Sequence, residues 1–245
     1  MTTAKKKVSE FEMQMSEIQM DILEMDPAMS LAAIFNTMRI LKNVNKGDAY
    51  YENYLSMRER YGNRFFDTYQ LLWGIGIHAK PKRILEIGTR TGISLCQLLS
   101  AMDHKAIQNI EKIVCVDPFD VWTSPNLVRA NLKYLNLPSE PEKVEILAIK
   151  SEEYFNSASK DRDGFGFDYI LVDGDHSKEV AKKDLDAAHK LLDKGGIIVF
   201  DDISTAPGEC ALLDVWDKFK SEHKDEYIFG EVLEGKGVGV GTKLI

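Results

Sequence analysis

The fold of this chain is decided by a short stretch in its first half, which reads LEIGTRTG over residues 85–92. An apolar run ends just before Gly88, which lets the backbone turn sharply away from a strand. Gly92 opens the next helical stretch, where a larger side chain would obstruct a ligand or the sheet. A dinucleotide fingerprint needs a further glycine inside the turn, but that place holds Thr89 or Arg90. The stretch therefore predicts a strand, a ligand-binding turn and a helix, and it disfavours a bound pyrophosphate.

Outward from this turn, short apolar runs rich in β-branched residues alternate with helical stretches, which is typical of βαβ units and a mainly parallel sheet. The expected strands cover residues 83–87, 112–116, 144–148, 167–172 and 196–200, and the expected helices cover 93–101, 126–135, 151–157, 178–192 and 208–222. The last two runs, 227–233 and 237–244, are expected to pair as a hairpin. We therefore expect an α/β fold with a doubly wound, Rossmann-like, seven-stranded and mainly parallel sheet that ends in an antiparallel hairpin.

The chain before residue 80 has a different pattern, because its apolar side chains recur at three- and four-residue steps. Such spacing predicts amphipathic helices, and packing of their apolar stripes is a more economical interpretation than a cofactor box. We expect residues 1–62 to form a helical extension that acts as a lid or a dimer contact, and residues 63–245 to form the α/β domain. These N-terminal helices favour a homodimer.

Composition and charge exclude several classes of protein. The 245 residues are 44% hydrophobic and 29% charged, as in a folded globular chain. A formal net charge of -8 disfavours binding to nucleic acid or to an anionic membrane. No apolar run suits a signal peptide or a membrane span. Cys96, Cys115 and Cys210 form no C-x-x-C pair and lie in or beside apolar runs, so we expect buried thiols in a reducing, cytoplasmic compartment.

Acidic side chains follow the other expected strands, and ligands of a doubly wound sheet bind beyond the carboxyl ends of its strands. Asp117, after the second strand, has the position of an acid that accepts hydrogen bonds from the two hydroxyls of a ribose. An aspartate before a proline is also a common turn former. Asp173 follows the fourth strand, and Asp201 and Asp202 follow the fifth.

If the fourth and fifth strands are adjacent, Asp173, Asp201 and Asp202 converge on one point, where they repel each other unless a cation lies between them. Oxygen ligands with room for water suit Mg²⁺, Mn²⁺ or Ca²⁺, whereas the alternative is that these acids cap the following helices. His176 starts a helix beyond Asp173. A lone histidine is usually a packing or surface residue, but a helix N-terminus disfavours imidazolium, so we expect a neutral ring that can accept a proton.

Together these residues resemble the motifs of class I S-adenosylmethionine-dependent methyltransferases, from Pro81 to the end of the sequence. The resemblance implies that the first turn wraps the methionine part of the cofactor, that the acid after the second strand binds its ribose, and that the helix after the third strand contacts its adenine. The cofactor-binding residues implied in this way are Glu86, Gly88, Thr89, Gly92, Asp117, Ser151, Glu152 and Asp173.

Within this class, residues 167–176 and 195–202 resemble the metal-dependent small-molecule O-methyltransferases. This sequence is similar to the catechol, caffeoyl-coenzyme-A and macrolide-sugar O-methyltransferases. The resemblance implies that Asp173, Asp201 and Asp202 bind Mg²⁺. Catechol-type enzymes have Asp-Asn after the fifth strand and a lysine base after the fourth. The macrolide-sugar branch is therefore closer to this sequence.

The implied reaction is methylation of a small-molecule hydroxyl, in which the cation lowers the hydroxyl pKa and His176 accepts the proton. Lys178 is the second candidate for the base. Three alternatives stay open: a metal-independent methyltransferase acting on nitrogen or carbon, a nicotinamide-dependent oxidoreductase, and a non-catalytic interaction protein. Whether Asp201 and Asp202 bind a cation distinguishes the metal-independent methyltransferase from the main hypothesis. Whether the protein binds S-adenosylmethionine or a nicotinamide cofactor distinguishes the oxidoreductase.

Overall fold

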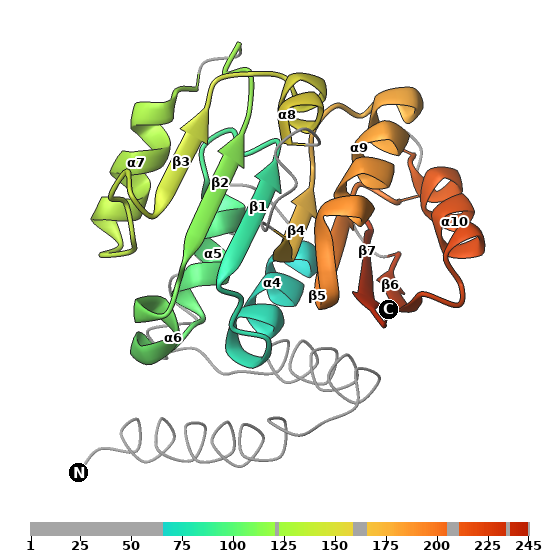
Figure 1. The fold of residues 1–245 in the computed structure, drawn as a ribbon, viewed down its shortest axis with the longest axis horizontal. Helices are drawn as coiled ribbons and strands as arrows, with labels where there is room; N and C mark the ends of the chain where they lie inside the picture. The colour runs from blue at the N-terminus through green and yellow to red at the C-terminus, as the bar shows by residue number, and fades with distance from the viewer. Residues whose placement is uncertain (1–65, 121–122, 159–165, 205–210, 234–235, 245) are drawn as a thin grey trace.

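The computed structural model describes residues 66–120, 123–158, 166–204, 211–233 and 236–244 (Figure 1). The expected helical extension over residues 1–62 lies outside the described residues, as does Cys210. The domain boundary at residue 63 and the homodimer through the N-terminal helices therefore stay predictions.

Seven strands and seven helices make up the described part of the chain. The strands are β1 (Arg83–Ile87), β2 (Lys112–Val116), β3 (Val144–Leu147), β4 (Phe167–Val172), β5 (Leu192–Asp201), β6 (Tyr227–Val232) and β7 (Val238–Lys243). The helices are α4 (Phe66–His78), α5 (Ile93–Ser100), α6 (His104–Gln108), α7 (Pro125–Tyr134), α8 (Ser151–Ala158), α9 (Lys178–Leu191) and α10 (Leu213–Glu222).

The strands form one sheet in the order β3-β2-β1-β4-β5-β7-β6. Strands β1 to β5 run parallel, whereas β7 is antiparallel to both β5 and β6. The predicted doubly wound sheet with a C-terminal hairpin is thus confirmed. Because Val238 pairs with Asp201, the turn that precedes β7 lies at the carboxyl end of β5.

Helices cover both faces of the sheet, which gives a three-layer α/β/α arrangement (Figure 1). Side chains of α4, α5 and α7 share one core with the strands, and side chains of α8, α9 and α10 share the other. Neighbouring strand residues such as Ile84 and Leu85 enter opposite cores, since side chains alternate along a strand. The continuous apolar runs in the sequence follow from this burial on both faces.

Local sequence accounts for the covering helices. Helix α9 buries Ala181, Leu185 and Ala188 at three- and four-residue steps, so its apolar stripe faces the sheet. Helix α6 was not expected from the sequence. The side chain of Asp103 caps it by accepting a hydrogen bond from the N–H of Ala106 over 2.8 Å. A capping aspartate was therefore the signal for this short helix.

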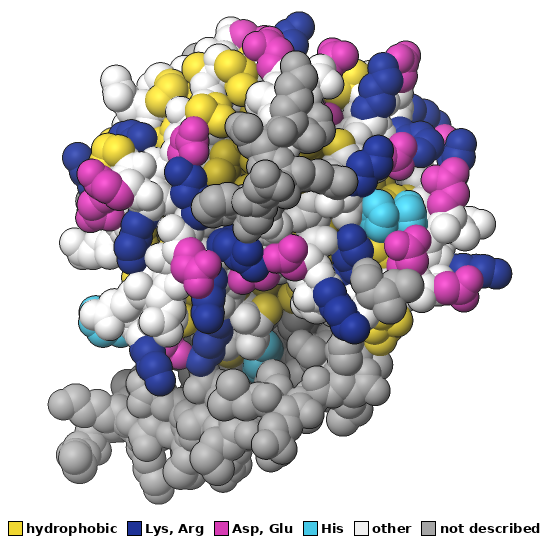
Figure 2. All heavy atoms as spheres, in the orientation of Figure 1, with side chains coloured by type: hydrophobic (Ala, Val, Ile, Leu, Met, Phe, Trp, Pro, Cys, Tyr) yellow, Lys and Arg dark blue, Asp and Glu magenta, His cyan; other side chains and the backbone are white. Residues whose placement is uncertain are grey.

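The surface carries both signs of charge. On the face seen in Figure 2, acidic and basic side chains are interspersed among the described residues rather than gathered by sign. The absence of a nucleic-acid partner stays a prediction. Within the described residues, no helix has the length and apolar character required to cross a membrane.

The ends of β1 and β4 meet at Gly88. This residue has a φ of 86°, and a Cβ built on it would lie 1.8 Å from the carbonyl oxygen of Asp173. Its N–H donates to the carbonyl of Val116 over 2.9 Å, and the N–H of Asp173 donates to the carbonyl of Ile87 over 2.9 Å. Glycine alone tolerates both the positive φ and this approach of two backbones.

Gly88→Ala is expected to destabilise the fold by about 2 to 4 kcal/mol, because left-handed strain and overpacking add. Gly195→Ala is the matched control, since Gly195 has a φ of 78° but nothing within 4 Å of an added Cβ. Its cost should be about 1 kcal/mol, from backbone strain alone. Denaturant unfolding of both variants measures the difference, and equal losses would contradict the steric role of Gly88.

Candidate functional site

A cavity of about 540 Å³ opens beyond the carboxyl ends of the strands. It lies where the strand order reverses between β1 and β4, which is the ligand-binding position of doubly wound sheets. The residues that line it are Ile87, Gly88, Arg90, Val116, Asp117, Pro118, Asp120, Thr123, Lys150, Ser151, Glu152, Asp173, Gly174, Asp175, His176, Val180 and Lys236.

The cavity brings together many of the residues singled out in the sequence. The predicted site residues in its wall are Gly88, Asp117, Ser151, Glu152, Asp173 and His176. Ser151 and Glu152 begin α8, as expected for the adenine end of the site, and Lys150 beside them was not predicted. The other predicted site residues do not line the cavity; they are Glu86, Thr89, Gly92, Lys178, Asp201 and Asp202.

The turn after β1 exposes its backbone to the cavity. Thr89 is buried beneath the turn, where its Oγ1 donates to the carbonyl of Glu86 over 3.3 Å. Gly92 has a φ of 74° and precedes α5, and a Cβ there would lie 2.9 Å from Cγ1 of Val128. Helix packing therefore explains Gly92, and Gly88 is the glycine that borders the ligand space.

Glu86 lies in β1 directly before the cavity wall and is only 2% exposed. Burial, and next the charge of Asp173, raise the pKa of Glu86 to about 8, so its carboxyl group is protonated at neutral pH. Its Oε2 has no hydrogen-bond partner among the described residues. A buried oxygen without a partner suits a polar ligand group or an ordered water beside the turn.

Asp117 is fixed by the backbone on both sides. One carboxylate oxygen accepts the N–H of Arg90 over 2.9 Å, and the other accepts the N–H of Phe119 over 2.7 Å. Asp117 is therefore a turn former, and this role is compatible with the ligand-binding role predicted from the sequence. Each carboxylate oxygen keeps a further lone pair, and the residue borders the cavity, so a ribose can still be bound.

The acids after β4 and β5 converge, as expected from the adjacency of these strands. Asp202 is buried, with its Oδ2 lying 3.0 Å from Nε2 of His176 and its Oδ1 lying 2.7 Å from Nζ of Lys236. Asp173 Oδ1 lies 3.7 Å from the same His176 nitrogen. Asp201 is also buried, and its Oδ1 accepts a hydrogen bond from the hydroxyl of Thr68 over 2.8 Å.

Lys236 places a positive charge inside this acid cluster, which we define as Asp173, Asp201 and Asp202. The lysine lies in the turn before β7, and its Nζ is 3.7 Å from Asp201 as well. The backbone holds it there, because the N–H of Ser204 donates to the Lys236 carbonyl over 2.7 Å. Lys236 is not predicted from the sequence, since only the pairing of β5 with β7 brings it to the acids.

The cluster shifts the pKa of its members in opposite directions. Burial, and next Asp173, raise the pKa of Asp201 to about 7. Burial acts against the charge of Asp202, but His176 and Lys236 hold its pKa below the usual range. Hydrogen bonds with Asp173 and Asp202 raise the pKa of His176 to about 10. The predicted neutral imidazole is therefore wrong for this arrangement, because two carboxylates outweigh the helix N-terminus.

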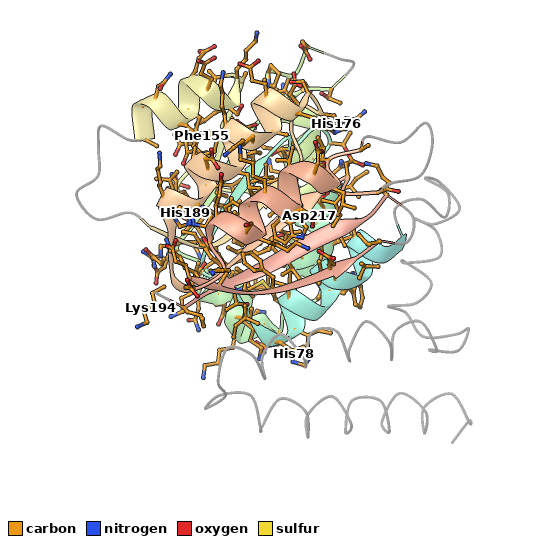
Figure 3. All side chains as sticks on the ribbon, turned by 90° about the vertical axis from the view of Figure 1, so that its right-hand side faces the viewer. His78, Phe155, His176, His189, Lys194 and Asp217 are labelled. Atoms are coloured by element: carbon orange, nitrogen blue, oxygen red, sulfur yellow. The ribbon has the colours of Figure 1, made fainter. Side chains whose placement is uncertain are left out.

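The two candidate bases lie in different surroundings. Figure 3 shows His176 near one end of α9, and this residue borders the cavity. Lys178 begins α9 but is 60% exposed, with its Nζ 2.8 Å from Oδ2 of Asp214. The structure does not bring Lys178 to the cavity, because the first turn of α9 directs it toward α10 instead.

Residues 85–203 match a family model described as a methyltransferase domain. A curated relative, the uncharacterized protein R132 of Acanthamoeba polyphaga mimivirus, is 29% identical over 120 residues, which are 48% of this chain and 50% of that protein. The chain thus spans about half the length of this curated relative.

Solved structures of methyltransferases have a similar fold. The O-methyltransferase TomG of Streptomyces achromogenes, in complex with SAM, has a TM-score of 0.57 and 17% identity over 85% of this chain and 96% of its own. An O-methyltransferase of Bacillus cereus, in complex with SAH, has a TM-score of 0.56 and 16% identity over 87% and 100%. A putative caffeoyl-CoA O-methyltransferase of Staphylococcus aureus has a TM-score of 0.56 and 19% identity over 81% and 93%.

The strand order, the glycine turn and acid in one cavity, and the family match agree. Residues 85–203 therefore match a methyltransferase domain, and the strand order and the cavity are those of the doubly wound fold seen in the solved methyltransferases. This result favours a methyltransferase over the nicotinamide-dependent oxidoreductase and over the non-catalytic interaction protein. The predicted resemblance to S-adenosylmethionine-dependent methyltransferases and the predicted fold class are both confirmed.

Asp117→Ala is expected to weaken S-adenosylmethionine binding about 10- to 100-fold, the usual cost of losing hydrogen bonds to a charged group. Titration calorimetry measures the affinity. Asp120→Ala is the control, because Asp120 borders the same cavity but is exposed and stands beyond the strand end. Thermal unfolding of Asp117→Ala checks that the turns held by this acid persist. Equal affinities for wild type and Asp117→Ala would remove the ribose assignment.

Proposed function

We propose that the protein transfers a methyl group from S-adenosylmethionine to a hydroxyl oxygen of a small molecule, with a divalent cation at the acid cluster. The observation that carries this proposal is that Asp173 and His176 border the cofactor cavity and also meet Asp202 at the cluster. A hydroxyl bound at this border lies beside groups that bind a cation and a proton. The similar solved structures that are named O-methyltransferases support oxygen as the acceptor.

The reaction forms a bond between the acceptor oxygen and the methyl carbon, and it breaks the bond from that carbon to the sulfonium sulfur. S-adenosylhomocysteine and the hydroxyl proton are the other products. Holding the oxygen and the methyl carbon in line provides much of the rate, since positioning replaces a bimolecular encounter. We assign this positioning to the turn at Gly88 and to Asp117 on the cofactor side, and to residues 173–176 on the acceptor side.

The acid cluster fits a divalent cation. Carboxylate oxygens of Asp173 and Asp202 and a ring nitrogen of His176 lie within 4.8 Å of one another. Carboxylate oxygens suit Mg²⁺, so on this proposal the two acids hold the cation and the ring is left to accept the proton. Asp201 is outside this group of ligand atoms, and its Oδ1 accepts the hydroxyl of Thr68. A cation held there lowers the pKa of a bound hydroxyl. Because Lys236 and His176 already balance the charge of Asp202, a divalent cation must compete with the Lys236 ammonium for this carboxylate.

The position of Lys236 also supports a second candidate function, which is metal-independent methyl transfer to nitrogen or carbon. The Lys236 ammonium lies 2.7 Å from Asp202, so the buried acids have a cation partner from the chain itself. In that case the cluster is a structural feature at the edge of the acceptor site. The response to chelation separates the two functions.

Chelation is expected to abolish turnover while S-adenosylmethionine binding persists, because Gly88 and Asp117 on the cofactor side lie outside the acid cluster. Direct titration should give Mg²⁺ binding that is lost in Asp202→Asn. Asp175→Asn is the control, since Asp175 follows β4, as Asp173 does, but accepts the N–H of Ser177 and lies outside the acid cluster. Full turnover in excess EDTA would refute the metal role and favour the second candidate.

His176 is the side chain placed to take the proton of the acceptor hydroxyl. Its Nε2 is within reach of Asp173 and Asp202, so it becomes a proton acceptor once these carboxylates are engaged elsewhere. Once the ring is charged, both of its nitrogens are donors, so the group that stabilises it after the transfer must accept a hydrogen bond from the ring.

His176→Ala is expected to lower kcat by a factor of about 10² to 10⁴ with little change in cofactor affinity, as for the loss of a general base. Lys178→Ala should leave kcat close to the wild-type value, because the Lys178 ammonium is paired with Asp214 at the surface. Steady-state kinetics with the same acceptor compare the two variants. A larger loss in Lys178→Ala than in His176→Ala would reverse the assignment of the base.

We also propose that the protein works in the cytoplasm. Cys96 and Cys115 are both buried and free of disulfides, which suits a reducing compartment. The small-molecule acceptor is in keeping with that location.

A further inference from the structure

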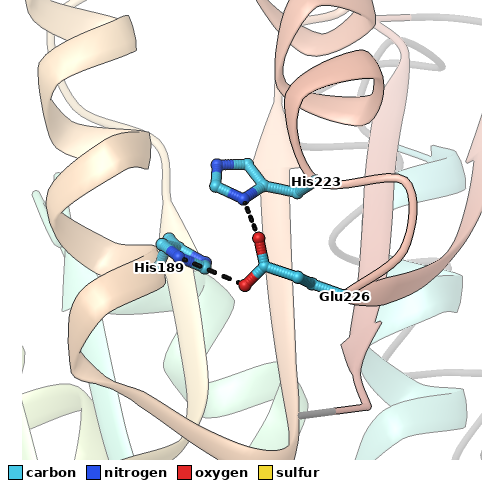
Figure 4. Close-up of side chains that lie close together, drawn as sticks. All are labelled: His189, His223 and Glu226. Atoms are coloured by element: carbon cyan, nitrogen blue, oxygen red, sulfur yellow. Dashed lines mark hydrogen bonds and ion pairs between the residues drawn. The ribbon is translucent and has the colours of Figure 1, made fainter.

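A second cluster of metal-ligating side chains lies outside the cofactor cavity. It consists of His189, His223 and Glu226, which face one another in Figure 4. Glu226 bridges the two rings, since its Oε1 lies 2.8 Å from Nδ1 of His223 and its Oε2 lies 3.8 Å from Nε2 of His189. One ligand atom from each residue falls within 4.8 Å of the other two. None of the three residues lines the cavity.

Three different elements carry these residues. His189 lies in the last turn of α9, His223 caps the end of α10, and Glu226 immediately precedes β6. The backbone of Glu226 is held on both sides, because its N–H donates to the His223 carbonyl over 2.9 Å and its carbonyl accepts the N–H of Leu244 over 2.7 Å. The cluster is therefore built before any ligand arrives.

The ring of His189 is oriented by a neighbour. Its Nδ1 lies 2.9 Å from the hydroxyl oxygen of Tyr227, and with the proton on Nδ1 the lone pair of Nε2 faces Glu226. A histidine that ligates a metal commonly donates its other N–H in this way, which fixes the tautomer.

We propose that His189, His223 and Glu226 form a binding site for a borderline transition-metal ion, of which Zn²⁺ is the representative. Two imidazoles and one carboxylate suit such an ion, whereas Mg²⁺ prefers oxygen ligands alone. Three protein ligands leave a fourth position for water. The three ligand atoms, which lie within 4.8 Å of one another without an ion, would move closer together to bind one.

The site is separate from the acid cluster. His176 precedes α9 and His189 lies near its far end, as Figure 3 shows, and a helix of 14 residues spans about 20 Å. An ion at the second cluster would tie the ends of α9 and α10 to the start of β6. Its role is then to stabilise the fold, independently of the proposed chemistry in the cavity.

The surroundings support one bound ion rather than a loose surface contact. The side chains of His189 and His223 are only 16% and 17% exposed. Their rings lie 4.1 Å apart between centroids, and Phe219 contacts both. Apolar surroundings of this kind limit the access of water and favour retention of a bound ion.

The test is titration of Zn²⁺ into the full chain in excess Mg²⁺, which keeps the acid cluster occupied by a harder ion. We expect one Zn²⁺ per chain and a rise in Tm on binding. His223→Gln and Glu226→Gln should each weaken Zn²⁺ binding at least about 10-fold, and Tyr227→Phe should weaken it about 10-fold through the lost support of His189. His104→Gln is the matched control, because His104 is exposed and outside the cluster.

Bound Co²⁺ gives a second readout, since its visible absorption distinguishes a four-coordinate nitrogen and oxygen site from a hydrated ion. The proposal is overturned if Zn²⁺ fails to bind in excess Mg²⁺, or if wild type and His223→Gln bind it equally. It is also overturned if Asp202→Asn, rather than His223→Gln, removes the zinc. None of these outcomes depends on whether the protein methylates an oxygen.

Discussion

The contact between two backbones at Gly88 is the constraint on which the site depends. Strands β1 and β4 are hydrogen-bonded neighbours, and their exits meet where the missing Cβ of Gly88 leaves room for the Asp173 carbonyl. This approach puts the cofactor turn and the first acid of the cluster on the same edge of the sheet. Asp117 completes the arrangement by accepting an N–H from the same turn. The cavity is thus shaped by main-chain geometry, and side chains supply its chemistry.

Charge compensation organises the acceptor side. Asp201 and Asp202 are both nearly fully buried, a position that carboxylates occupy only with partners. Thr68, His176 and Lys236 provide these partners from three separate parts of the fold. The chain itself therefore supplies cationic partners for these acids. A metal ion and the Lys236 ammonium can each compensate the negative charge of these carboxylates. The proposed methylation of oxygen therefore depends on which of the two cations is bound there during turnover.

Much of the fold followed from the sequence because its strands are buried on both faces. Continuous apolar runs gave the bounds of β1, β2 and β4 as the structure has them, and acids directly after such runs marked the cavity. Long-range contacts were not readable in this way. Lys236 reaches the acids only through the pairing of β7 with β5. The charge state expected for His176 was wrong because Asp173, three residues before it, and Asp202, which is distant in sequence, both act on the same ring.

The place of Lys236 in the last hairpin has a consequence for how the site is assembled. A growing chain that has reached only β5 carries all three acids of the cluster without their ammonium partner. Those acids then repel one another, and the edge of β5 that later binds β7 is bare. When the hairpin docks, β7 pairs with the edge of β5 and Lys236 pairs with Asp202 at the same time. A nascent chain therefore exposes the bare edge of β5 until that hairpin emerges, and a truncation before it leaves the sheet two strands short and Asp202 without its lysine.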